Sequence, residues 1–71
     1  MKGEYALGFS DYAEDGSEWK GYIICRKINE EELGFQYFEK DNGRHIHWKS
    51  IPNEIQIAIE ERISDEETRR K

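Results

Sequence analysis

Two histidines, His45 and His47, have the residue type and spacing that come nearest to a metal site. They lie two positions apart, so on a β-strand both side chains point to the same face of the sheet. A strand can supply two zinc ligands in this way, but a catalytic zinc needs a third ligand from the protein. The residues predicted to lie beside them are Gln36, Lys40 and Lys49. We therefore expect no metal at this position and no cofactor.

An acidic pattern, Asp11 with Asp15 and Glu18, has the outline of a calcium-binding loop. In an EF-hand, however, the third position carries an acid or an amide and the twelfth carries a bidentate glutamate. Those positions hold Ala13 and Tyr22 in this chain. The segment is therefore predicted to be a charged, solvated turn.

Nucleophilic chemistry has one candidate, Cys25, which is the only cysteine of the chain. A single cysteine excludes an intramolecular disulfide and a thiolate zinc cluster. Its place in the middle of a predicted strand indicates a small buried residue with no base beside it. The sequence also lacks a Ser-His-Asp spacing and a Gly-rich phosphate loop, so it predicts a protein that is not an enzyme.

The remaining candidate is a binding surface in which aromatic side chains are edged by basic ones. Tyr12, Trp19, Ile23 and Phe38 are four large apolar residues on a sheet face that is predicted to face solvent. Soluble proteins rarely expose so large an apolar patch unless it binds a partner. The predicted partner-binding residues are Tyr12, Trp19, Ile23, Phe38, Lys40, His45, His47 and Lys49. The alternative is that the sheet curls and buries some of these side chains, which would make them core residues.

These positions follow from the stretch Leu33–Ile51, in which Asn42-Gly43 favours a tight hairpin turn. A two-residue type I′ turn at these positions places Tyr37 opposite Trp48. Side chains alternate between the two faces of a strand, so the turn also decides which face each residue occupies.

Two further turns extend the sheet. A turn at Asp15-Gly16 pairs Leu7 with Ile24, and a loop over residues 29–32 pairs Ile24 with Tyr37. The three turns place one set of apolar residues on a common face, and this agreement supports the pairing. The predicted core face of the sheet holds Leu7, Phe9, Tyr22, Ile24, Ile28, Leu33, Phe35, Tyr37, Ile46 and Trp48.

The C-terminal segment is predicted to be a helix over about 53–68 that covers this sheet. Pro52 suits a first helical turn, and the apolar residues behind it recur at helical spacing. That stripe consists of Ile51, Ile55, Ala58, Ile59 and Ile63. A strand is the alternative, since Ile55, Ile57 and Ile59 also alternate, but the length and the acidic flank favour a helix.

Together these elements predict an α+β fold with one domain over residues 1–71. It is a four-stranded antiparallel β-meander made of two hairpins, with one C-terminal α-helix packed on one face. The strands are expected over about 4–12, 19–28, 33–40 and 44–50. The sheet either stays open or curls into a small SH3-like barrel.

The formal net charge is −5, and its distribution along the chain is uneven. The hairpin at 33–51 is slightly basic, whereas the two ends of the chain are acidic. This argues against nonspecific binding to duplex DNA, which depends on phosphate neutralisation. A chain without a membrane-length apolar run or a signal-like start is expected to be cytoplasmic.

These observations favour a small non-catalytic module that binds another protein as an adaptor or inhibitor. The acids of Asp11–Glu18, Glu30–Glu32 and the helix could imitate a row of phosphates and occupy a nucleic-acid site on the partner. The alternative function is single-stranded nucleic-acid binding on the aromatic and basic sheet face. Small size, acidity and a single cysteine are shared by many unrelated regulators and by phage or mobile-element proteins, so composition identifies no family.

Overall fold

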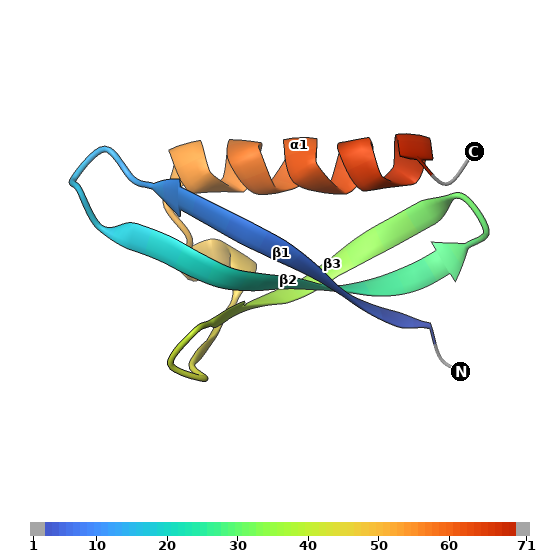
Figure 1. Ribbon diagram of the computed structural model, residues 1–71, viewed down its shortest axis with the longest axis horizontal. Coiled ribbons are helices and arrows are strands. Elements are labelled where there is room, and N and C mark those ends of the chain that lie inside the picture. The colour runs from blue at the N-terminus through green and yellow to red at the C-terminus, as the bar shows by residue number, and fades with distance from the viewer. Residues whose placement is uncertain (1–2, 70–71) are drawn as a thin grey trace.

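The computed structural model describes residues 3–69, and the outermost residues 1–2 and 70–71 lie outside the described part. It confirms the predicted α+β meander with one C-terminal helix (Figure 1). The four strands are hydrogen-bonded in sequence order, and a single 3₁₀ turn precedes the helix. The elements are β1 (Glu4–Tyr12), β2 (Glu18–Asn29), β3 (Glu32–Lys40), β4 (His45–Ile46), η1 (Trp48–Ser50) and α1 (Asn53–Arg69).

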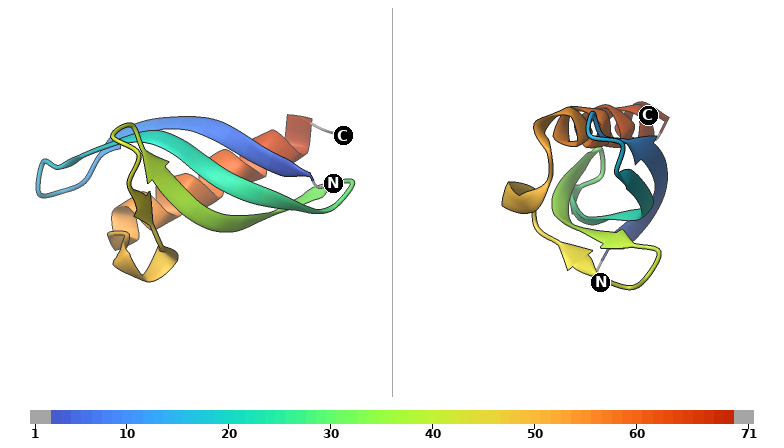
Figure 2. Two further views of the ribbon diagram at one scale, coloured as in Figure 1. Left: turned by 90° about the horizontal axis from the view of Figure 1, so that it is seen from below. Right: turned by 90° about the vertical axis from the view of Figure 1, so that its left-hand side faces the viewer.

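The sheet is strongly twisted and stays open, with β1 and β4 as its two edges (Figures 1 and 2). It therefore does not close into the small barrel that was the alternative. Helix α1 covers one face, and its predicted stripe of Ile55, Ile59 and Ile63 is buried there together with Ile51. Ile57 lies off this stripe and is 50% exposed.

Both glycine turns differ from the prediction by one residue. A type I′ turn requires a positive φ at both central residues. Among the described residues, however, only glycines have a positive φ, including Gly16 at 90° and Gly43 at 91°. Each turn is therefore a three-residue loop with the glycine in its last position, over residues 14–16 and 41–43. Two backbone hydrogen bonds close these loops. The Ala13 amide donates to the Ser17 carbonyl at 2.9 Å, and the Lys40 amide donates to the Arg44 carbonyl at 2.8 Å.

The side chain before each glycine favours this longer loop. The Asp15 carboxylate accepts a hydrogen bond from the Ser17 backbone amide at 2.9 Å, and the side-chain oxygen Oδ1 of Asn42 accepts one from the Arg44 backbone amide at 2.9 Å. Asp and Asn commonly bond the backbone two residues ahead in this manner. The bond stabilises a conformation in which only the following glycine needs a positive φ.

The longer loops move the strand register by one residue and so exchange the two faces. Leu7 lies opposite Ile23 instead of Ile24, and Phe38 lies opposite Ile46 instead of His47. A slip of one residue turns every side chain of a strand to the other face. For this reason Ile23 and Phe38, predicted to face solvent, are core residues.

Between β2 and β3 the predicted pairing of Ile24 with Tyr37 is correct, but a β-bulge interrupts it at the next pair. Cys25 lies opposite Phe35, which leaves Gln36 without a partner in the ladder. An extra residue of this kind breaks the alternation of side chains. It allows Phe35 and Phe38 to face α1 although they are three residues apart.

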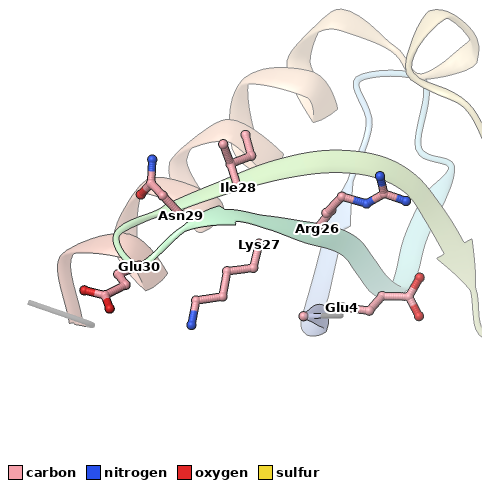
Figure 3. Close-up of a pocket in the computed structure, with 7 residues that line it drawn as sticks. Glu4, Arg26, Lys27, Ile28, Asn29 and Glu30 are labelled. Carbon is pink, nitrogen blue, oxygen red and sulfur yellow. The ribbon is translucent and has the colours of Figure 1, made fainter. Parts of the chain in front are cut away.

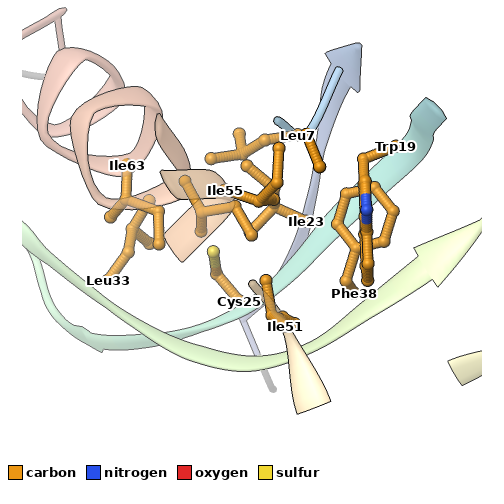
Figure 4. Packing of buried hydrophobic residues seen from close by; sticks show 11 residues of the cluster. Leu7, Trp19, Ile23, Cys25, Leu33, Phe38, Ile51, Ile55 and Ile63 are labelled. Carbon is orange, nitrogen blue, oxygen red and sulfur yellow. The ribbon is translucent and has the colours of Figure 1, made fainter. Parts of the chain in front are cut away.

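The core is built around Phe38, which has no exposed surface. The Phe38 ring makes edge-to-face contacts with Phe9 at 5.7 Å and with Trp19 at 5.5 Å between ring centres. Figure 4 shows Trp19 and Phe38 side by side at one end of the cluster and Leu33 with Ile63 at the other. The buried cluster contains Leu7, Ala13, Trp19, Ile23, Cys25, Leu33, Phe38, Ile51, Ile55, Ile59 and Ile63.

Several residues of the predicted core face lie elsewhere because of the changed register. Tyr22 is 51% exposed and Ile28 is 59% exposed, while Tyr37 is only half-buried. Trp48 is half-buried at the rim of the core. The strand predicted over 44–50 is reduced to β4, since the chain turns at η1 and carries Ile51 into the core.

Three side chains of α1 bond to the backbone of the sheet and its loops. Glu54 accepts a hydrogen bond from the Glu14 amide at 2.9 Å, and Arg62 donates one to the Gly8 carbonyl at 3.3 Å. At the other end of the helix, Glu67 accepts a hydrogen bond from the Leu33 amide at 2.7 Å. The polar bonds thus hold α1 at both sheet edges while its isoleucines fill the centre.

We expect Phe38→Ala to lower the free energy of unfolding by about 3–5 kcal/mol, because it opens a cavity in the centre of the core. A loss of that size would leave a domain of this length largely unfolded. Tyr22→Ala on the uncovered sheet face is the matched control and should change stability by less than about 1 kcal/mol. Chemical denaturation followed by circular dichroism measures both, and equal losses would contradict the assigned faces.

Gly21→Ala should destabilise the protein by at least about 2 kcal/mol. A Cβ at position 21, where φ is +153°, would lie 2.1 Å from the Glu39 carbonyl oxygen. Gly8 sits on the neighbouring strand, and a Cβ there would meet nothing within 4 Å. Thermal unfolding should therefore show Gly8→Ala close to wild type, and a tolerated Gly21→Ala would refute this close approach of β2 and β3.

Candidate functional site

The predicted partner-binding patch does not exist as a single surface. Trp19 is 6% exposed, and Ile23 and Phe38 have no exposed surface, so these three offer almost no contact area to a partner in the folded state. Lys40 is half-buried, and its Nζ atom lies 4.3 Å from the centre of the Trp19 ring. The Lys40 side chain thus covers the edge of the core. Tyr12, at the end of β1, is 64% exposed.

The remaining predicted residues lie on exposed parts of β4 and the turn after it. His45 stacks on Tyr37, with ring centres 4.2 Å apart and an interplanar angle of 19°. His47 and Lys49 are exposed at the start and within η1. Throughout residues 3–69, no group of three or more His, Cys, Asp or Glu side chains is placed to hold a metal ion.

A different surface gathers apolar and acidic side chains, where α1 passes over β3. A hollow of about 500 Å³ lies here, within the size range typical of ligand sites. Its apolar floor comes from β3, η1 and the buried side of α1, and its polar rim comes from α1 alone. The hollow is lined by Leu33, Phe35, Trp48, Glu60, Ile63, Ser64 and Glu67.

Trp48 forms one wall of this hollow and is held from two sides. Its ring makes an edge-to-face contact with Phe35, with 4.9 Å between ring centres. Its carbonyl accepts a hydrogen bond of 2.8 Å from the Gln56 side chain of α1. Because both contacts fix η1 against the core, the hollow is preformed in the folded chain.

The hollow continues along α1 into a second one of about 320 Å³, which shares Ser64 and Glu67 with it. The second hollow is mostly polar and carries three glutamates. It is lined by Asn29, Glu31, Glu32, Ser64, Glu67 and Thr68. The two together, called the α1–β3 groove below, pass from an apolar end to an acidic end, and none of their lining residues is basic.

One border of the groove is an open sheet edge. Within the described residues, β4 pairs with β3 only at Phe38 and Glu39. From Glu32 to Tyr37, no described strand lies on that side of β3. Unpaired edges of this kind are templates for an added strand.

A larger hollow of about 980 Å³ lies near the turn between β2 and β3 but lacks a converging set of groups. It mixes both signs of charge, with Glu4, Arg26, Lys27 and Glu30 among its lining residues. Figure 3 shows the charged ends of Glu4, Lys27 and Glu30 pointing out in different directions. The α1–β3 groove is therefore the better candidate site.

The sequence prediction missed the groove although it contained a signal for it. Leu33, Phe35, Trp48 and Ile63 were predicted as core, and the groove is the uncovered rim of that core. Glu60, Ser64 and Glu67 recur at helical spacing beside the isoleucine stripe, so they had to border the sheet. The short β4 that leaves the edge open had no such signal.

Cys25 lies fully buried in the core and is not among the residues that line this groove. Burial, with a smaller contribution from the nearby Glu67 carboxylate, raises the pKa of the Cys25 thiol from 9.0 to about 11. The thiol is therefore protonated at neutral pH, and the thiolate is the reactive form.

No protein-family model, curated protein or solved structure matches the chain. Within the described residues, no helix combines the length and the apolar character needed to span a bilayer.

We expect Cys25 to resist a thiol reagent such as Ellman's reagent at pH 8 in the folded protein and to react fully in denaturant. The unfolded thiol loses its proton near pH 9, whereas the folded one keeps it until a pKa of about 11. The stability that Cys25 contributes, measured against Cys25→Ala, should therefore fall as the pH rises from about 9 to 11. Rapid labelling of the native protein would contradict this burial.

Proposed function

We propose that this chain is a non-catalytic module that binds another protein as an adaptor or inhibitor in the cytoplasm. The observation that carries the proposal is the α1–β3 groove, whose apolar floor lies beside an acidic rim. A surface with an aromatic and aliphatic centre and polar borders has the organisation of a protein interface. Trp48 is the natural anchor, since tryptophan is enriched among residues that dominate binding energy.

The chemistry of the groove supports binding rather than catalysis. Its hydroxyl groups belong to Ser64 and Thr68, and no histidine lines the groove that could activate them. Glu67 is held by the Leu33 amide, and Cys25 below the floor is a protonated thiol. A nucleophile paired with a base, the usual signature of covalent catalysis, is missing from this set of lining residues.

Single-stranded nucleic-acid binding has weaker support. Bases stack on exposed aromatic side chains, and Trp19 and Phe38 are buried. The uncovered sheet face still carries Tyr22 and the stacked pair of Tyr37 and His45. The net charge of −5 disfavours binding to phosphates.

The acidic groups suggest how an inhibitor of this kind could act. Glu31, Glu32 and Glu67 line one hollow, and Glu60 continues the acidic row along α1. A row of carboxylates can meet the basic surface that a partner uses for nucleic acid. The partner that fits this proposal is therefore a protein with a basic surface.

Affinity capture with the tagged full chain, followed by reconstitution from purified components, tests the proposal. We expect a protein partner that survives nuclease treatment and forms a complex of defined stoichiometry in isothermal titration calorimetry. Binding should weaken only modestly between low and moderate salt, because the apolar centre contributes as well as the charges.

The control is a fluorescent oligonucleotide of single-stranded RNA or DNA, whose binding would fall steeply with salt. Tight oligonucleotide binding, or the failure of every captured protein to form a complex after purification, would contradict the proposed function.

A further inference from the structure

We infer that the α1–β3 groove binds an extended, cationic segment of the partner that adds as a strand to the open edge of β3. The inference rests on the proposed function and names the chemistry of the partner at the same site. Three features of the groove support it: the direction of the β3 backbone, the apolar floor and the uncompensated acidic rim.

The backbone of β3 is oriented to receive a strand. The Leu33 amide donates to Glu67 of α1, so it points away from β2. In an antiparallel strand, the backbone amide and carbonyl of successive residues point alternately to one side of the strand and to the other. Leu33 and Phe35 are two residues apart, and no register shift between β2 and β3 lies between them. The amide and carbonyl of Phe35 therefore point to the same open side.

The apolar floor provides the anchor for such a segment. Phe35 and Trp48 are half-buried, and Leu33 and Ile63 close the floor below them. A side chain of an added strand that faces α1 would enter this hollow, and its neighbours would point away, since side chains alternate. A hollow of about 500 Å³ holds one or two aliphatic or aromatic side chains.

The charges select basic flanking residues. Both arginines of α1 within the described residues are occupied by other carboxylates. Arg62 contacts Glu66 at 3.4 Å, and Arg69 contacts Asp65 at 3.4 Å. Neither arginine lines the groove, so no basic lining residue neutralises the carboxylates of its rim.

A short, capped peptide Lys-Ser-Val-Ser-Lys, called the Lys-Val peptide, is the probe, because its valine and both lysines are spaced two residues apart and so face α1 together. We expect it to change the fluorescence of Trp48 in the full chain, and the change should be absent in Trp48→Phe, which keeps Trp19. It should also slow the hydrogen exchange of the Phe35 amide, because strand addition gives this group a partner. The same peptide with Gly in place of Val tests the anchor and should bind more weakly. The peptide with Glu in place of both lysines, called the Glu-Val peptide, tests the charge.

The double variant Glu60→Gln with Glu67→Gln should weaken binding of the Lys-Val peptide about tenfold, because it removes two rim charges. Gln at position 67 keeps an acceptor for the Leu33 amide. The matched control, Asp11→Asn with Glu18→Gln, removes the same charge from exposed positions on β1 and β2 and should bind like wild type.

Equal weakening by both double variants would reduce the effect to net charge and overturn the inference. So would equal binding of the Glu-Val peptide, or a Phe35 amide whose exchange is unchanged at saturation. A purified partner that forms a complex while none of the peptides binds would overturn this inference alone. Failure of every captured protein to form a complex would overturn the proposed function and this inference with it.

Discussion

The positive φ of Gly16 and Gly43 sets the strand register on which the rest of the structure depends. Each glycine is the last residue of a three-residue loop, and its positive φ allows the chain to reverse direction there. The resulting register places Ile23 and Phe38 under α1 and leaves Tyr22 on the uncovered face. The isoleucine stripe of α1 then has a continuous apolar surface to cover.

The groove forms at the rim of the core, where the packing of α1 on the sheet ends. The chain leaves the sheet after the two residues of β4, because Ile51 must reach the core and η1 provides the turn. This exit exposes the β3 edge and leaves Trp48 beside it as a half-buried wall. A small domain has too few residues to cover every side of its core, so an uncovered rim is available for binding.

The sequence predicted the number, order and type of the elements because turn residues and apolar spacing report them directly. It predicted the wrong faces for Trp19, Ile23 and Phe38, because Asp-Gly and Asn-Gly fit two-residue and three-residue loops equally well by composition. The difference is one residue, and one residue exchanges the faces. No feature of the local sequence predicts the bulge at Gln36. Its effect is to bring Phe35 and Phe38 to the same face of the sheet.

Cross-strand contacts between α-protons, measured by nuclear Overhauser spectroscopy, test the register most directly. These protons come close at non-hydrogen-bonded pairs of an antiparallel ladder. The bond between Lys40 and Arg44 makes Glu39 and His45 such a pair, so a strong contact between their α-protons is predicted. A contact between Lys40 and His45 instead would indicate a two-residue turn and contradict the assigned faces, the core and the groove together.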